Sequence, residues 1–251
     1  MQLVPRILGT TARVPDGEIV YAIGDIHGRH DLLCRLHQSI AEDLATMTAG
    51  RSASIIYLGD YIDRGPDSRA VLDHLLDHSV NGAQSTFLRG NHEDTLLRFL
   101  DGQDGGEQWL ALGAGATARS YGVSLRSQEG KALPPDVIRT RMNAAVPARH
   151  LTFLRALRLS HEVGDYLFVH AGIRPGRRLD EQDPQDMLWI RDEFLRSRRN
   201  HGSFIVHGHA ASSEIVVRRN RICVDTMAYA TDRLTSIVLE GTSRRFMSAA
   251  P

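Results

Sequence analysis

The 251-residue sequence has little cysteine, no excess of charge of either sign and no long apolar run. Its two cysteines, Cys34 and Cys223, fall in a helical pattern and in an apolar strand pattern, so we interpret both as ordinary buried thiols without a disulfide or zinc role. Lys plus Arg number 30, and Asp plus Glu also number 30. This balance gives no indication of a nucleic-acid or membrane partner, and we expect neither.

We also expect no segment that would direct the chain to a membrane or out of the cell. No apolar run approaches the roughly 20 residues that a membrane-spanning helix needs. Residues 1–10 have no apolar core behind a basic start, which argues against a secretory signal. We therefore expect a soluble protein in the reducing cytoplasm. The length suffices for one domain with a well-buried core, and we expect a single domain over residues 1–251.

The first part of the chain alternates strand patterns with helix patterns. Apolar strands are predicted at 19–23, 54–58 and 86–88, and helices at 31–44, from about 68, and at 93–100. Three strand–loop–helix units in series predict an α/β layer whose sheet is largely parallel.

The remainder of the chain has two further patterns. Residues 101–130 are rich in glycine and small residues, and Pro134-Pro135 and Pro147 are suited to open two helices. We interpret about 101–158 as a small helical insertion or cap. After residue 160 the chain is mostly strands, predicted at 161–163, 166–170, 204–206, 215–217, 222–225 and 234–239, with one solvated helix within 189–200. The expected fold class is α/β, a layered β-sandwich flanked by helices.

Five short polar motifs follow predicted strands, and each contains glycine. They are GDIHG at 24–28, GDYIDRG at 59–65, GNHE at 90–93, VHAG at 169–172 and VHGH at 206–209. Ligand sites gather at the carboxyl ends of strands in α/β sheets, where glycine permits sharp turns and close backbone approach. One such Asp or His alone would be a turn, cap or core residue. Five in order, offering Asp, Asn and His donors that suit Mn, Fe or Zn, predict a site for two metal ions.

In combination the motifs resemble the phosphoprotein phosphatase branch of the calcineurin-like metallophosphoesterases, in particular its bacterial and phage serine/threonine protein phosphatases. The resemblance extends from about residue 19 to residue 239 and implies the calcineurin-like fold. It implies that Asp25 and His27 bind one metal ion, that Asn91, His170 and His209 bind the other, and that Asp60 bridges the two. The expected cofactors are two divalent or transition metal ions, with Mn²⁺ favoured and Fe or Zn as alternatives.

The same resemblance implies roles beyond metal binding. His92 is expected to be the general acid that protonates the leaving alkoxide, with Asp63 orienting and charging its imidazole. Arg64, Asn91 and Arg191 are expected to bind the substrate phosphate. In the two arginines the guanidinium fork matches two phosphoryl oxygens.

Several assignments are looser. Arg174, Arg196 and Arg198 are alternatives to Arg191 as the second phosphate-binding arginine. His207 is expected to line the site without binding metal. Asp225, after a late strand, is interpreted as structural.

The activity that the resemblance implies is two-metal hydrolysis of phosphomonoesters by a metal-bridging hydroxide. The first hypothesis is dephosphorylation of phosphoserine and phosphothreonine in proteins, which the intact Asp63–Arg64 pair favours. One alternative is hydrolysis of dinucleoside polyphosphates or another small phosphoester. Another is an inactive phosphate-binding module, which the complete set of expected ligands argues against. The expected partner is therefore a phosphoprotein or a small phosphoester.

Overall fold

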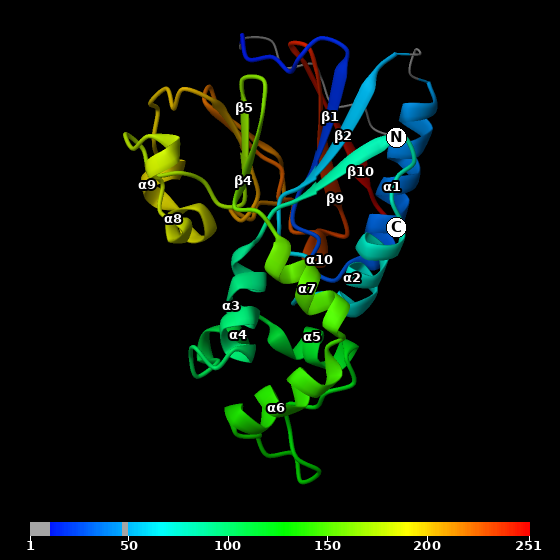
Figure 1. Ribbon diagram of the computed structural model, residues 1–251, viewed down its shortest axis with the longest axis vertical. Coiled ribbons are helices and arrows are strands. Elements are labelled where there is room, and N and C mark those ends of the chain that lie inside the picture. Colours follow the sequence, from blue (N-terminus) through cyan, green and yellow to red (C-terminus); the bar gives the residue numbers. More distant parts are fainter. Residues whose placement is uncertain (1–10, 47–49) are drawn as a thin grey trace.

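The computed structural model describes residues 11–46 and 50–251, and within them the strands form two five-stranded sheets that pack face to face between helices (Figure 1). The strand orders are β10-β9-β1-β2-β3 and β4-β5-β6-β8-β7. This arrangement confirms the predicted α/β layered sandwich. The prediction about residues 1–10 lies outside the described residues.

Both sheets combine parallel and antiparallel pairs. The first contains β1 (Glu18–Ile23), β2 (Ser52–Tyr57), β3 (Ala83–Phe87), β9 (Leu234–Glu240) and β10 (Ser243–Ala249). The second contains β4 (Ser160–Val163), β5 (Tyr166–Val169), β6 (Phe204–His207), β7 (Val216–Val217) and β8 (Arg221–Cys223). β1, β2 and β3 pair in parallel, as do β5, β6 and β8, and the other strands join by antiparallel pairing.

Strand β1 shows why its sequence is apolar on both faces. Tyr21 and Ile23 pack in the core beneath the helices, whereas Val20 and Ala22 pack in the core between the two sheets. Alternate side chains of a strand point to opposite faces, so a strand covered on both sides has no polar face. The short apolar run is therefore a central strand.

Helices cover the outer face of each sheet (Figure 1). α1 (His30–Ala45) and α2 (Ser68–Asp77) pack on the first sheet, where Leu36 and Val71 join its core. α8 (Pro184–Trp189) and α9 (Asp192–Leu195) pack on the second, where Phe194 meets Leu167. The sequence predicted one helix within 189–200. In the structure this range holds only α9, a single short turn, because α8 ends at Trp189.

The middle of the chain is helical. It contains α3 (Asn91–Leu100), α4 (Glu107–Ala111), α5 (Ala114–Ser120), α6 (Pro135–Ala145) and α7 (Ala148–Ala156), which group below the sheets in Figure 1. α6 begins at Pro135 and α7 follows Pro147, as predicted, since proline tolerates the first turn of a helix. That this region acts as a cap stays a prediction.

Strand β10 was not predicted, because its sequence SRRFMSA places two arginines in a short segment. Arg244 is nevertheless buried: its guanidinium lies 3.9 Å from the centre of the Phe204 ring, and Nε donates to Tyr166 OH at 2.7 Å. Aromatic faces thus replace water around this cation. The remaining short elements are η1 (Leu179–Glu181) and α10 (Ala228–Thr231). Across 11–46 and 50–251, every helix is too short or too polar to cross a membrane.

Candidate active site

The five polar motifs meet at one edge of the two packed sheets because the parallel strands that precede them end there. Their loops are hydrogen-bonded to one another. His27 N donates to Asp60 O at 2.8 Å, which joins the loop after β1 to the loop after β2. Gly208 N donates to His170 O at 2.8 Å, which joins the loops after β5 and β6. Residues that are far apart in sequence are thereby fixed side by side.

The backbone is strained at this edge. Seven non-glycine residues in the described part of the chain have positive φ, and five of them are predicted site residues. These five are His27 (46°), Asp60 (53°), Asp63 (70°), Arg64 (66°) and His209 (60°). The left-handed region costs an L-residue roughly 1–2 kcal/mol. Such outliers cluster where surrounding structure holds side chains for a function, so the strain independently marks this edge as a site.

Asp60 lies at the centre of the site and is buried. Its Oδ2 is 3.6 Å from His27 Nε2 and 3.8 Å from His92 Nε2, while Oδ1 is 3.4 Å from His170 Nε2. Burial alone would raise the pKa of Asp60, but the surrounding imidazoles, His170 foremost, would lower it below its ordinary value whenever they carry a proton. The two oxygens of Asp60 thus face different groups of nitrogen atoms.

Asn91, His170 and His209 form one side of the site. Asn91 Oδ1 lies 2.9 Å from His170 Nε2 and 2.9 Å from His209 Nδ1. His170 Nδ1 donates to the backbone oxygen of Leu58 at 2.8 Å, and burial lowers the pKa of this imidazole. A neutral His170 therefore directs the lone pair of Nε2 at another acceptor, Asn91 Oδ1. A cation satisfies two acceptors that face each other in this way.

Asp25 lies at the same centre, next to the loop that carries Gly208 and His209. Oδ2 of Asp25 accepts a hydrogen bond from His209 N at 3.0 Å. Burial raises the pKa of Asp25 well above its ordinary value, and the charges of Asp225 and Asp60 add to this effect. Asp225 is itself buried, and its pKa rises to about 6. Carboxylates crowded together out of water need a positive charge nearby, which a metal ion supplies.

Unsatisfied nitrogen atoms give a second test of fit to metal. His27 Nδ1 donates to Ile62 O at 2.8 Å, which leaves the lone pair on Nε2. Nε2 of His27 and Nε2 of His209 are buried and have no hydrogen-bond partner within the described residues. Burial lowers the pKa of His27 to about 3 and of His209 to about 2, so both imidazoles are neutral. Neutral imidazoles whose other nitrogen is anchored are suited to bind metal.

His92 and Asp63 form a buried pair beside Asp60. His92 Nδ1 lies 2.7 Å from Asp63 Oδ2, and Nε2 has no hydrogen-bond partner within the described residues. Burial alone would lower the pKa of His92, but the carboxylates of Asp60 and Asp63 raise it. Asp63 also accepts hydrogen bonds on Oδ1 from Thr117 Oγ1 at 2.5 Å and from Trp109 Nε1 at 3.3 Å. Helices α4 and α5 thus fix the orientation of the pair.

Two arginines lie beside this centre. The Arg64 guanidinium lies 4.9 Å above the ring of Tyr229, and its charge lowers the pKa of Asp25 and His27 as a lesser cause. Arg191 is exposed and donates from Nη2 to the backbone oxygen of His209 at 3.3 Å. Both guanidinium groups therefore lie beside the residues that are predicted to bind metal.

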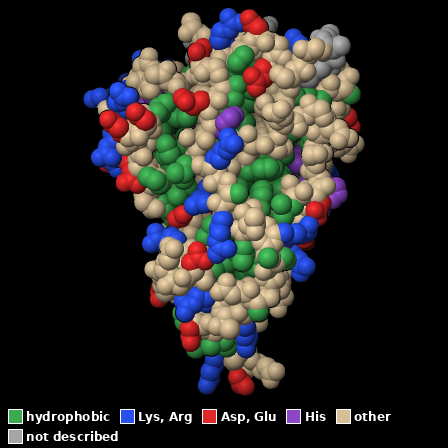
Figure 2. Space-filling model, viewed as in Figure 1, with side chains coloured by type: hydrophobic (Ala, Val, Ile, Leu, Met, Phe, Trp, Pro, Cys, Tyr) green, Lys and Arg blue, Asp and Glu red, His purple; other side chains and the backbone are tan. Residues whose placement is uncertain are grey.

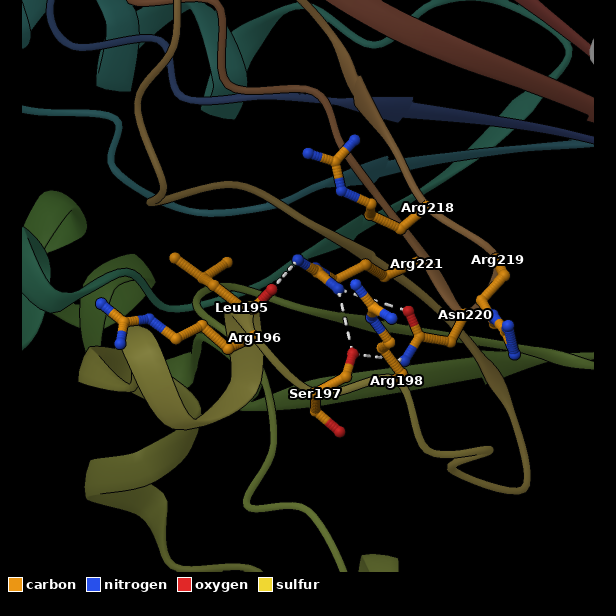
Figure 3. A pocket seen from close by; sticks show the side chains of 8 residues that line it. All are labelled: Leu195, Arg196, Ser197, Arg198, Arg218, Arg219, Asn220 and Arg221. Carbon is orange, nitrogen blue, oxygen red and sulfur yellow. Dashed lines mark hydrogen bonds between the residues drawn. The ribbon is translucent and has the colours of Figure 1, made fainter.

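The alternatives to Arg191 lie elsewhere. Arg174 pairs with Asp186 and Glu193. Arg196 and Arg198 line a separate hollow of about 440 Å³ near the residue at which β8 begins. The predicted site lies at the other end of the strands, where they end. Figure 3 shows this hollow, lined by Leu195, Arg196, Ser197, Arg198, Arg218, Arg219, Asn220 and Arg221. Basic side chains also gather at the left edge of Figure 2, on the side where Figure 1 places α9.

His207 is buried next to the centre but belongs to neither group of potential ligands. Its Nδ1 donates to Gly208 O at 2.9 Å, and its ring packs edge-on against Phe194 at 5.1 Å between centres. Nε2 has no hydrogen-bond partner within the described residues. At this edge, two groups have donor atoms that could share an ion: His27 with Asp60 and His92, and Asp60 with His170 and His209.

Sequence reasoning missed the residues that support this arrangement. Glu93 accepts hydrogen bonds from the backbone N–H groups of Asp60, Tyr61 and Gly90 at 2.8–2.9 Å, so it shapes the loop after β2. Its position in the GNHE motif was the feature of the sequence that could have indicated this role. Asp225 follows β8 at the same edge of the second sheet and lies close enough to affect the pKa of Asp25. Its position after a predicted strand could have indicated that it lies near the site. Nothing in the sequence linked Trp109 or Thr117 to Asp63.

The chain is similar to known phosphoesterases in sequence and in fold. The family model described as calcineurin-like phosphoesterase matches residues 19–235. Serine/threonine-protein phosphatase 2 of Escherichia coli (strain K12) is 26% identical over 86% of this chain and 90% of its own length. A symmetrical bis(5'-nucleosyl)-tetraphosphatase of Nitrosomonas europaea is 31% identical over 64% of this chain, which spans 47% of that relative. A cold-active protein-tyrosine phosphatase from a Shewanella species shares the fold, with TM-score 0.62, 17% identity and coverage of 94% and 83%.

Proposed function

This chain belongs to the calcineurin-like phosphoesterase family, and we propose that it is a metal-dependent hydrolase of phosphomonoesters that acts on phosphoserine and phosphothreonine in proteins. The relative named serine/threonine-protein phosphatase 2 supports this substrate class, since the match extends over nearly the whole length of both proteins. Relatives named bis(5'-nucleosyl)-tetraphosphatase support a second candidate, hydrolysis of dinucleoside polyphosphates, and the asymmetrical enzyme of Bacillus mycoides also matches over 86% of this chain and 88% of its own length.

The position of Asp60 between two groups of donor atoms is the observation on which the proposal rests. A carboxylate whose oxygens face separate groups can bridge two cations. Asp25 and His27 would complete one ion's set of ligands, and Asn91, His170 and His209 the other's. When bound, the two ions supply Lewis-acid charge to the phosphoryl oxygens and lower the pKa of a water molecule, for which Mn²⁺, Fe or Zn are suitable.

His92 would supply the proton that the leaving group needs. Asp63 accepts from Nδ1, so a protonated His92 presents its second N–H at Nε2, the atom that has no partner within the described residues. A serine or threonine side chain leaves as an alkoxide, a strong base that requires a proton in the transition state. Asp63 both orients the imidazole and raises its pKa, which keeps that proton available.

Arg64 and Arg191 would bind and orient the phosphate. A guanidinium fork can donate to two phosphoryl oxygens at once, and its charge offsets the negative charge of the phosphoryl group. Contact with the Tyr229 ring limits the directions in which Arg64 can point. A fixed fork loses less entropy when phosphate binds, which favours the transition state.

A comparison of two substrates tests the assignment. Manganese-loaded protein is given a phosphoserine peptide or diadenosine tetraphosphate, and kcat/KM is measured for each, with Asp60→Asn protein as the control for contaminating activity. We expect kcat/KM for the peptide to exceed that for the dinucleotide by about tenfold or more. The reverse ranking, with both activities absent from the variant, would replace the first candidate by the second.

A further inference from the structure

A second group of metal-binding side chains lies between helices α1 and α2, apart from the residues discussed above. His30 and Cys34 are four residues apart on α1, and His74 lies on α2. The three potential ligand atoms all lie within 4.8 Å of one another, and each of the three residues is half-buried. Histidine side chains reach the right-hand edge of Figure 2, the side on which Figure 1 places α1 and α2.

The spacing of these atoms matches what a zinc ion requires. Cys34 Sγ is 3.2 Å from His30 Nε2 and 3.7 Å from His74 Nδ1. Zinc binds sulfur at about 2.3 Å and imidazole nitrogen at about 2.0 Å in tetrahedral geometry, so its S and N ligands lie about 3.5 Å apart. The three side chains need only small movements to share one ion, and a water molecule can complete the tetrahedron.

Buried groups behind His74 can hold its ring in the orientation for binding. His74 Nε2 lies 3.0 Å from His37 Nδ1, and His37 Nε2 lies 2.9 Å from Tyr57 OH. When each Nε2 carries the hydrogen, His74 donates to His37 and His37 donates to Tyr57. The lone pair of His74 Nδ1 then points to Cys34. Metal-binding histidines commonly donate their other N–H in this way, which fixes tautomer and ring.

We propose that His30, Cys34 and His74 form a second metal site, which binds a borderline-soft divalent cation such as Zn²⁺ and ties α1 to α2. Thiolate and imidazole ligands together favour this class of ion over Mg²⁺ or Ca²⁺. Binding replaces the thiol S–H bond by a metal–sulfur bond and releases the proton to solvent. Cys34 is half-buried, not buried as the sequence predicted, and the zinc role that the proposal gives it replaces the interpretation as an ordinary thiol only if the test below succeeds.

The position of the site suggests what it does for the molecule. α1 directly follows the loop that carries Asp25 and His27, and α2 follows the loop that carries Asp60 and Arg64. An ion shared by the two helices would hold the elements into which both loops run at a fixed separation. The site would thereby stabilise the strand-end edge without contributing a ligand to it.

Cobalt is a direct probe of this site, because a thiolate bound to Co²⁺ gives near-ultraviolet charge-transfer absorption that imidazole and carboxylate ligands do not give. Full-length protein without a histidine tag is first loaded with manganese and then titrated with Co²⁺. We expect the absorption to develop to one equivalent, to be lost in Cys34→Ser and to weaken in His74→Gln. The matched control, His161→Gln, removes a half-buried histidine of β4 and is expected to behave as wild type.

Competition with a zinc-sensitive chelator provides a second measurement. We expect Cys34→Ser to weaken the binding of one zinc ion at least tenfold, with circular dichroism showing that the variant is folded. His37→Leu, which keeps all three ligands, is expected to weaken zinc binding by about 10–100-fold. Absence of the charge-transfer band in the wild type, or its survival in Cys34→Ser, would overturn the proposal. Neither result would affect the proposed hydrolysis, which uses other residues.

Discussion

The molecule gathers histidines in two places that differ in setting. At the strand ends, His27, His170 and His209 are buried around a central carboxylate, and His27 and His209 have strained backbone. Between α1 and α2, His30 and His74 are half-buried on regular helices with a thiol between them. The first setting excludes water and concentrates charge, which suits chemistry on a charged substrate. The second joins two helices near the surface, which suits stabilisation.

Removal of the bridging charge is expected to have the largest effect of any single change. Asp60→Asn keeps the shape of the side chain but removes the negative charge between the two groups of ligands. We expect kcat/KM for p-nitrophenyl phosphate to fall by roughly 1,000-fold or more, because both metal ions depend on this carboxylate. Elemental analysis should find less than two ions per chain at the strand ends. Two tightly bound ions there, in an active variant, would contradict the bridging role.

His92→Asn is expected to have the next largest effect. Loss of a general acid costs about 10²–10⁴-fold in rate when the leaving group needs a proton. The variant should therefore lose far more activity on a phosphoserine peptide than on p-nitrophenyl phosphate, whose leaving group is stable as an anion. Metal content should be unchanged. Equal losses of kcat on both substrates would show that His92 does not act as the acid.

Thr117→Val tests whether the helical middle of the chain reaches into the active site. The change is nearly isosteric but removes the hydroxyl that donates to Asp63 Oδ1 and accepts from Asp63 N. We expect kcat to fall by about tenfold, in line with the loss of a hydrogen bond to a charged group. Trp109→Phe, which loses the longer bond to Asp63, should cost less. Unchanged kcat in both variants would restrict α4 and α5 to a structural role.

The fold and the centre of the site could be predicted because both follow from local sequence patterns. Apolar runs followed by glycine and Asp, Asn or His identify strand ends, and parallel strands bring those ends to one edge. The contacts of Thr117 with Asp63 could not be predicted, because they depend on how a helical segment folds back over a loop 54 residues earlier. Strand β10 was missed because Arg244 is buried against aromatic rings that no local pattern announces.

The group between α1 and α2 was missed for a related reason. On α1 alone, His30 and Cys34 are ordinary residues of an amphipathic helix. Cys34 and His74 are 40 residues apart, and only the packing of α2 on α1 brings them together. A ligand set built across two helices leaves no contiguous motif, whereas one built on consecutive strand-end loops leaves a motif at every loop.

The last expected effect is on stability and not on catalysis. Zinc added to manganese-loaded wild type at 100 times its Kd should stabilise the fold by about 2.7 kcal/mol, or raise Tm by about 5–10 °C. Cys34→Ser should show a smaller rise under the same conditions, and His161→Gln the same rise as wild type. Equal shifts in all three proteins, measured by scanning calorimetry, would mean that zinc acts only at the strand ends.

Hydrolysis of p-nitrophenyl phosphate by chelator-stripped protein, with and without added Mn²⁺, tests the central claim most directly, with Asp60→Asn as the control. We predict no turnover after stripping, recovery on addition of Mn²⁺, and no recovery in the variant. Absence of turnover with Mn²⁺, Fe²⁺, Zn²⁺ or Mg²⁺ in protein shown to hold two ions would contradict the proposed phosphoesterase activity.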